Sequence, residues 1–295
     1  MFTEFLEAWT LFGDAWLTGW LLAAGLGACG VLLAARDQVF LGAAVAQATA
    51  LGLAAALALG GLAAAGASET QDPHAHPHAH GMSGEPDERF ALALAAAFGV
   101  GGAWLTTLGG RKESREALTA WVFLASSAGA VLLLAHGPHG LEEVKRLHAS
   151  TLLAATGADL AWSALFALGS AALLAGGWRK LLLLTVDPEM AAAAGLNVAR
   201  WNALMLAWLG LGLALSIRCA GTLYAFGCLA LPALAARQLC RELGAMLAVA
   251  PLLALGAAGA GFMLAHRFDL PPAHATVGLL AACLPAACLA RRLLR

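Results

Sequence analysis

The sequence predicts an all-α integral membrane protein, a polytopic bundle of eight or nine transmembrane helices in one domain over residues 1–295. Of its residues, 61% are hydrophobic and only 12% are charged, and the mean hydropathy is +0.77. A soluble domain carries about 25% charged residues. Long apolar runs recur along the whole chain, whereas the short alternating segments of a β-barrel are not seen. Most of this chain is therefore expected to lie in a lipid bilayer.

Each apolar run is close to the roughly 20 residues that a membrane helix needs. The predicted spans are 15–35, 39–66, 90–108, 118–136, 160–177, 201–217, 219–236, 243–265 and 273–290. They are rich in Ala, Leu and Gly, which suits close helix packing in lipid. Segment 219–236 is short and contains Pro232, so it is either a full span or a broken or re-entrant helix. The count of eight or nine depends on that segment.

The distribution of basic residues predicts the orientation. With nine spans, most of the 17 Lys and Arg residues fall in one set of loops: Arg36, Arg111, Lys112, Arg115, Arg179, Lys180, Arg200, Arg237, Arg241, Arg291, Arg292 and Arg295. Basic loops face the cytoplasm. The N-terminus is then expected outside and the C-terminus inside. A net charge of −1 and the lack of a basic stripe argue against a nucleic-acid partner.

The loop at residues 67–89 is rich in histidine and is predicted to lie on the extracytoplasmic side of the membrane. Four histidines alternate there with Ala or Pro: His74, His76, His78 and His80. Neutral imidazole is a ligand for zinc, copper and nickel. An extended chain would place the four rings on one face, and flanking carboxylates add charge. We expect this loop to capture metal, although a tract without a role has the same composition.

The segment at residues 185–197 predicts a short helix in a cytoplasmic loop. Asp187 suits the N-cap, Pro188 the first helical position, and Glu189 the positive end of the helix. Gly195 suits the position just beyond the C-terminus. Such a helix is too short to be stable alone, so it is expected to dock on another surface. A plain connecting turn is the alternative.

Three stretches resemble the permeases of the zinc, manganese and iron ABC importers. The 187–195 segment looks like their coupling-helix motif, with Asp-Pro-Glu followed by Ala and Gly. The segment 221–237, from Gly-Thr-Leu to Leu-Pro-Ala-Leu-Ala-Ala-Arg, is similar to another family stretch. Phe-Asp-Leu-Pro-Pro at 268–272 resembles the family's late extracellular turn. The similarity keeps the family's order and spacing from the second span to the C-terminus.

The resemblance implies a transport subunit rather than an enzyme, in a bacterial inner membrane. It implies import of a divalent metal, zinc or manganese, by alternating access, with no permanently bound cofactor. The partners implied are a cytoplasmic ABC ATPase, an extracytoplasmic metal-binding protein and a second permease subunit, identical or different. The chain has no phosphate-binding loop of its own, so ATP hydrolysis has to come from the ATPase. Asp187, Pro188, Glu189 and Gly195 would contact that partner.

The second span departs from the family pattern. In the family this span carries an Asp and a His, four residues apart, that bind metal. Here Ala43 and Gln47 stand at those positions. An alanine has no ligand atom, and an amide oxygen is a poor ligand for zinc. Gln47 and Thr49 are the polar groups left to face a pathway, unless they are only packing residues between helices.

Four alternatives remain open on these residues: an importer of a metal chelate, an importer of another small solute, a secondary transporter and a membrane-embedded enzyme. An enzyme would need convergent titratable groups at membrane depth, and the predicted spans lack them. A secondary transporter needs ionisable groups within its spans, and the predicted spans have almost none. The loss of the Asp and His ligands predicts that no tight metal site lies inside the membrane.

Overall fold

The computed structural model describes residues 2–68, 88–108, 112–135 and 152–293. Within these ranges the chain is helical and contains no strand. The elements are α1 (Phe2–Ala35), α2 (Val39–Ser68), α3 (Glu88–Thr107), α4 (Lys112–Ala135), the short 3₁₀ helix η1 (Leu152–Ala154), α6 (Gly157–Val186), α7 (Pro188–Ala193), α8 (Val198–Leu239), α9 (Leu243–Phe268) and α10 (Pro272–Leu293).

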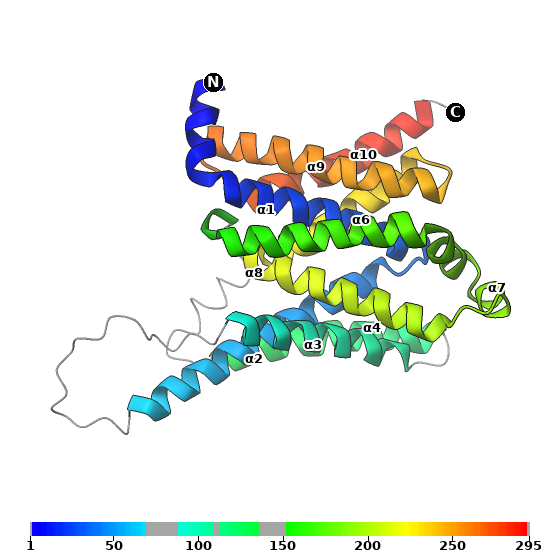
Figure 1. Cartoon of the computed structure of the whole chain (residues 1–295), viewed down its shortest axis with the longest axis horizontal. Coiled ribbons are helices and arrows are strands. Elements are labelled where there is room, and N and C mark those ends of the chain that lie inside the picture. Colours follow the sequence, from blue (N-terminus) through cyan, green and yellow to red (C-terminus); the bar gives the residue numbers. More distant parts are fainter. Residues whose placement is uncertain (1, 69–87, 109–111, 136–151, 294–295) are drawn as a thin grey trace.

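Eight helices of the described part are long and apolar enough to cross a membrane, which confirms the predicted fold class. They lie roughly along one common direction, and α7 protrudes at one end of the bundle (Figure 1). We call this end the α7 end and the opposite one the far end. The large apolar side chains that remain exposed are concentrated on these helices, as expected where lipid replaces water as the solvent. Such an apolar surface is favourable in lipid and unfavourable in water, so the fold suits a bilayer.

Helix α8 comprises two arms that meet at Gly221. Its 42 residues would span about 63 Å if straight, twice the thickness of a bilayer core. Gly221 has φ 85° and ψ 168°, a conformation open almost only to glycine. The two arms, residues 198–220 and 222–239, therefore run in different directions. Gly221 is the residue whose missing side chain permits this change.

Contacts along the two arms show that α8 returns to the end at which it began. Asn202 of the first arm bonds to Arg36 at the α7 end, and Arg218 is ion-paired with Asp159 at the far end. The second arm then follows α1 back. The Tyr224 hydroxyl donates to the backbone oxygen of Gly19, and Arg237 donates to that of Ala34 at the α7 end.

The reversal explains why the sequence left eight or nine spans open. Eight long helices make nine passes, because α8 supplies two of them. Segments 201–217 and 219–236 were expected as separate spans, and each corresponds to one arm of α8. An odd number of passes also places the start of α1 at the far end and the end of α10 at the α7 end (Figure 1).

Small residues allow the second arm of α8 to lie close against α1. A Cβ added at Gly30 would overlap the backbone oxygen of Leu229, which cannot move aside as a flexible side chain would. Both helices are rich in buried Ala at this contact, including Ala34 and Ala233. Backbones that approach this closely gain van der Waals contact, which is the main attraction between helices in lipid.

Candidate functional site

Helix α7 has the two ends that the sequence predicts. The Asp187 carboxylate accepts a hydrogen bond from the backbone N–H of Met190 at 2.9 Å, and Pro188 occupies the first turn. Beyond the helix, Gly195 adopts φ 82°, a left-handed conformation that favours glycine. The N–H groups of Gly195 and Leu196 donate to the backbone oxygens of Ala192 and Ala191, both at 3.0 Å. This pair of bonds is a Schellman cap.

The same helix is poorly covered by its own chain. Among the described elements it packs mainly against α6 and α8. Ala191 is its one buried residue, whereas Met190 is 60% exposed and the neighbouring Val186 is 72% exposed. Glu189 lies in the first turn, where its charge favours the positive end of the helix. A capped helix that presents bare apolar side chains at the end of a membrane bundle has the form of a docking element.

Beside α7 the bundle contains a cavity of about 820 Å³. Its lining residues come from the ends of α1, α3 and α6 and the starts of α2, α4 and α8. They extend from Pro188 and Val198 at the α7 end to Ser170 and Trp208, which lie deeper along α6 and α8. The Trp208 indole N–H donates to the Ser170 hydroxyl at 2.9 Å. The cavity therefore lies in the half of the bundle nearest to α7.

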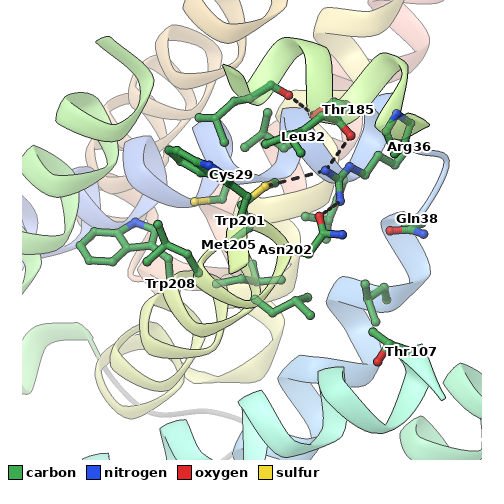
Figure 2. A pocket seen from close by; sticks show the side chains of 18 of the residues that line it. Cys29, Leu32, Arg36, Gln38, Thr107, Thr185, Trp201, Asn202, Met205 and Trp208 are labelled. Atoms are coloured by element: carbon green, nitrogen blue, oxygen red, sulfur yellow. Dashed lines mark hydrogen bonds between the residues drawn. The ribbon is translucent and has the colours of Figure 1, made fainter. Parts of the chain in front are cut away.

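Arg36 projects from the α1–α2 turn into the wall of this cavity (Figure 2). Its guanidinium donates to the Asn202 side-chain oxygen at 3.0 Å and to the backbone oxygen of Leu184 at 3.1 Å. The Met205 sulfur lies 3.9 Å from the same group. Burial lowers the pKa of Arg36 from its ordinary value, because the charged form loses hydration. The ordinary pKa of arginine is so high that the side chain remains a cation at neutral pH.

The two polar residues expected to face a pathway in the second span do not line the cavity. Gln47 is half-buried, and Thr49 is fully buried with its hydroxyl donating to the backbone oxygen of Val45 at 2.8 Å. Ala43 is buried as well. The part of the chain around the start of α2 that does line the cavity comes earlier, at Gln38, Phe40 and Leu41. A pathway role for Gln47 and Thr49 stays a prediction.

The histidine loop lies outside the described residues, so His74, His76, His78 and His80 are not placed. Within the described ranges, no group of three or more His, Cys, Asp or Glu side chains is positioned to hold a metal ion. The structure thus offers no candidate metal centre in the part of the chain it describes.

Sequence reasoning missed an ion pair at the far end. Asp159 lies in the first turn of α6, is only 7% exposed, and pairs with Arg218 of the first arm of α8. Its other carboxylate oxygen accepts from the Thr156 N–H at 2.8 Å and from the Thr156 hydroxyl at 2.9 Å. The Cys219 thiol lies 3.7 Å from the first oxygen. Thr156-Gly-Ala-Asp159 is a capping-box pattern, which was a usable signal for the start of α6.

Two solved structures have a similar fold. One is described as PsaBC from Streptococcus pneumoniae in complex with Fab; it is 18% identical, with 97% of this chain and 95% of that chain covered and a TM-score of 0.78. The other is described as a metal-chelate type ABC transporter in an inward-facing conformation. It is also 18% identical, with 93% and 84% covered and a TM-score of 0.66. At this identity the likeness concerns the fold.

Family membership comes from the sequence itself. The model of the ABC 3 transport family matches residues 88–291, more than half of the chain. The match includes α7, both arms of α8 and the turn before α10, where the three resembling stretches lie. The chain therefore belongs to the ABC 3 transport family, which confirms the kinship with metal-importer permeases that its motifs predicted.

Proposed function

We propose that this chain is the permease subunit of an ABC importer that carries a divalent metal, zinc or manganese, across the bacterial inner membrane. The observation that carries the proposal is α7, which is capped at both ends, exposed, and placed at the end of the bundle. The family match and the two solved structures of similar fold support it.

In this proposal the α7 end faces the cytoplasm. Ten basic residues of the described chain support this orientation under the positive-inside rule: Arg36, Lys112, Arg115, Arg179, Lys180, Arg200, Arg237, Arg241, Arg291 and Arg292. The start of α1 then lies outside and the end of α10 inside. The cavity beside α7 would open to the cytoplasm, while the Asp159–Arg218 pair would help to close the outer side.

The mechanism in this proposal is alternating access. A cytoplasmic ATPase binds α7 and closes on ATP, and the displacement of α7 switches the bundle between its two open sides. An extracytoplasmic binding protein delivers the metal, and a second permease subunit completes the pathway. The free energy for this switch comes from ATP, which binds more tightly to one conformation of the transporter than to the other. A ligand shifts a conformational equilibrium only by that difference in affinity.

One observation favours a second candidate cargo, a metal chelate. Ala43 is buried and Gln47 is a neutral amide, so this face of α2 has no group that replaces the hydration of a bare cation. A chelate keeps its own ligands and needs none from the spans. Both cargoes share the permease fold and the ATPase, so they differ only in what is carried.

The test is uptake into proteoliposomes that contain this permease, its ATPase and its binding protein. The proposal expects Zn²⁺ or Mn²⁺ to accumulate only when ATP is supplied on the α7 side. Uptake of a chelated metal without uptake of either bare ion would assign the chelate as the cargo. Uptake that depends on a proton or sodium gradient and does not depend on ATP would contradict the proposal and indicate a secondary transporter.

The histidine loop is proposed to collect metal outside the membrane. Replacing His74, His76, His78 and His80 by Ala should lower zinc uptake severalfold when zinc is scarce and change it little when zinc is abundant, since the loop would only raise the local concentration. Uptake rates across a range of free zinc check this. Titration calorimetry on a peptide of residues 67–89 is the direct measurement, and absence of zinc, nickel or copper binding near pH 7 would refute the role.

A further inference from the structure

Arg36 contacts both helices that flank α7. Its acceptor on α6, the backbone oxygen of Leu184, lies three residues before the Asp187 cap that begins α7. Its acceptor on α8, the Asn202 side chain, lies five residues after Asn197, which caps the start of that helix. One planar guanidinium thus joins the segments that enter and leave α7, as the dashed lines in Figure 2 show.

The turn that carries Arg36 is itself held firmly. It consists of residues 36–38, between α1 and α2, and Asp37 adopts a left-handed φ of 54°. Arg237, near the end of the second arm of α8, donates to the Asp37 carboxylate at 2.6 Å and to the backbone oxygen of Ala34 at 3.1 Å. Backbone bonds from the N–H groups of Arg36, Asp37 and Gln38 close the turn. A displacement of Arg36 therefore moves the end of α1 and the start of α2, because the turn between them is not a flexible loop.

We propose that Arg36 is the residue that transmits the movement of α7 to α1 and α2, an inference that rests on the proposed function. When the ATPase moves α7, the ends of α6 and α8 move with it, because Asp187 ends α6 and also caps α7. The guanidinium is hydrogen-bonded to both of those helices, so the α1–α2 turn moves when they move. Helix α2, which carries Ala43 and Gln47, begins directly after this turn.

The choice of residue and partners suits this role. Arginine offers donors in a rigid fork that can hold two acceptors at once, whereas lysine presents a single point charge. The oxygen acceptors of Arg36 are neutral groups on α6 and α8. Hydrogen bonds that involve one charged group are stronger than neutral ones, so they can carry a displacement and still rearrange during a transport cycle. All three side chains of this contact, Arg36, Asn202 and Met205, line the cavity whose shape has to change.

The experiment measures zinc transported per ATP hydrolysed in the reconstituted complex of permease, ATPase and binding protein. Arg36→Gln is expected to lower this ratio about tenfold, the effect of losing roughly 1.4 kcal/mol of coupling, while ATP hydrolysis stays within about twofold. Arg36→Lys should give an intermediate ratio. Asn202→Ala removes one acceptor without touching the arginine and should lower the ratio as well. Arg291→Gln is the matched control, because Arg291 lies at the same end and donates to the Gln238 side chain rather than to α6 or the first arm of α8.

A double variant distinguishes a shared contact from two separate effects. If Arg36 acts through Asn202, Arg36→Gln with Asn202→Ala should be little worse than Arg36→Gln alone. An unchanged ratio in Arg36→Gln overturns the proposal. Equal losses of uptake and ATP hydrolysis in both single variants would overturn it too, since they would indicate a purely structural contact. If the wild-type complex shows no ATP-driven uptake, the proposed function fails first and the transmission role fails with it.

Discussion

Replacing Gly195 by proline is expected to abolish ATP-driven uptake while the permease still enters the membrane. Proline fixes φ near −65°, whereas Gly195 adopts 82°, and the substitution also removes the N–H that donates to Ala192. The cap at the end of α7 cannot form. A six-residue helix without its cap is not stable, so uptake is expected to fall roughly a hundredfold, the equivalent of about 3 kcal/mol.

The measurements are zinc uptake and the amount of ATPase that co-purifies with the permease. Asp187→Lys is the companion change at the other end, since it removes the acceptor for Met190 and places a positive charge at the positive end of the helix. Gly195→Asn is the control, because asparagine tolerates a left-handed conformation and should retain most of the uptake. Normal uptake and normal ATPase recovery with Gly195→Pro would show that α7 is only a connecting turn.

The second large effect concerns stability. Asp159→Ala removes the carboxylate that faces Arg218 and accepts from Thr156. Breaking one half of a buried ion pair costs about 3–5 kcal/mol, because the remaining charge stays out of water. The midpoint of thermal unfolding in detergent is therefore expected to fall by about 10 °C.

Two further variants test the cause. Asp159→Leu combined with Arg218→Met removes both charges and should recover most of the lost stability, since apolar replacements of a buried pair are often neutral. Asp37→Ala is the matched control. Asp37 forms an ion pair with Arg237 in which the side chains are 68% and 46% exposed, so its loss should cost at most about 1 kcal/mol. An unfolding midpoint for Asp159→Ala equal to that of Asp37→Ala would contradict the explanation.

Local signals made parts of this protein predictable. The ends of α7 depend on Asp187, Pro188 and Gly195, which act within one or two helical turns, so the sequence could place that helix. The spans follow from long apolar runs, each of which is a helix wherever lipid is the solvent. Boundaries were less well predicted: α6 continues to Val186, past the expected end at residue 177, because Arg179 and Lys180 keep their charges in solvent on a helix that has no reason to stop.

By itself the sequence determined the class, the family and the capped helix, because composition, apolar run length and helix caps act over short distances. Tertiary structure decided that segment 219–236 is a full pass joined to the previous one at Gly221, and it decided the contacts of Arg36 and Arg218, which follow from packing. Arg36 meets Asn202 across 166 residues, and Arg218 of α8 pairs with Asp159 of α6. No periodicity encodes which helices become neighbours at such separations, since in a bilayer that choice depends on the shape and polar pairing of surfaces that exist only after the helices have formed.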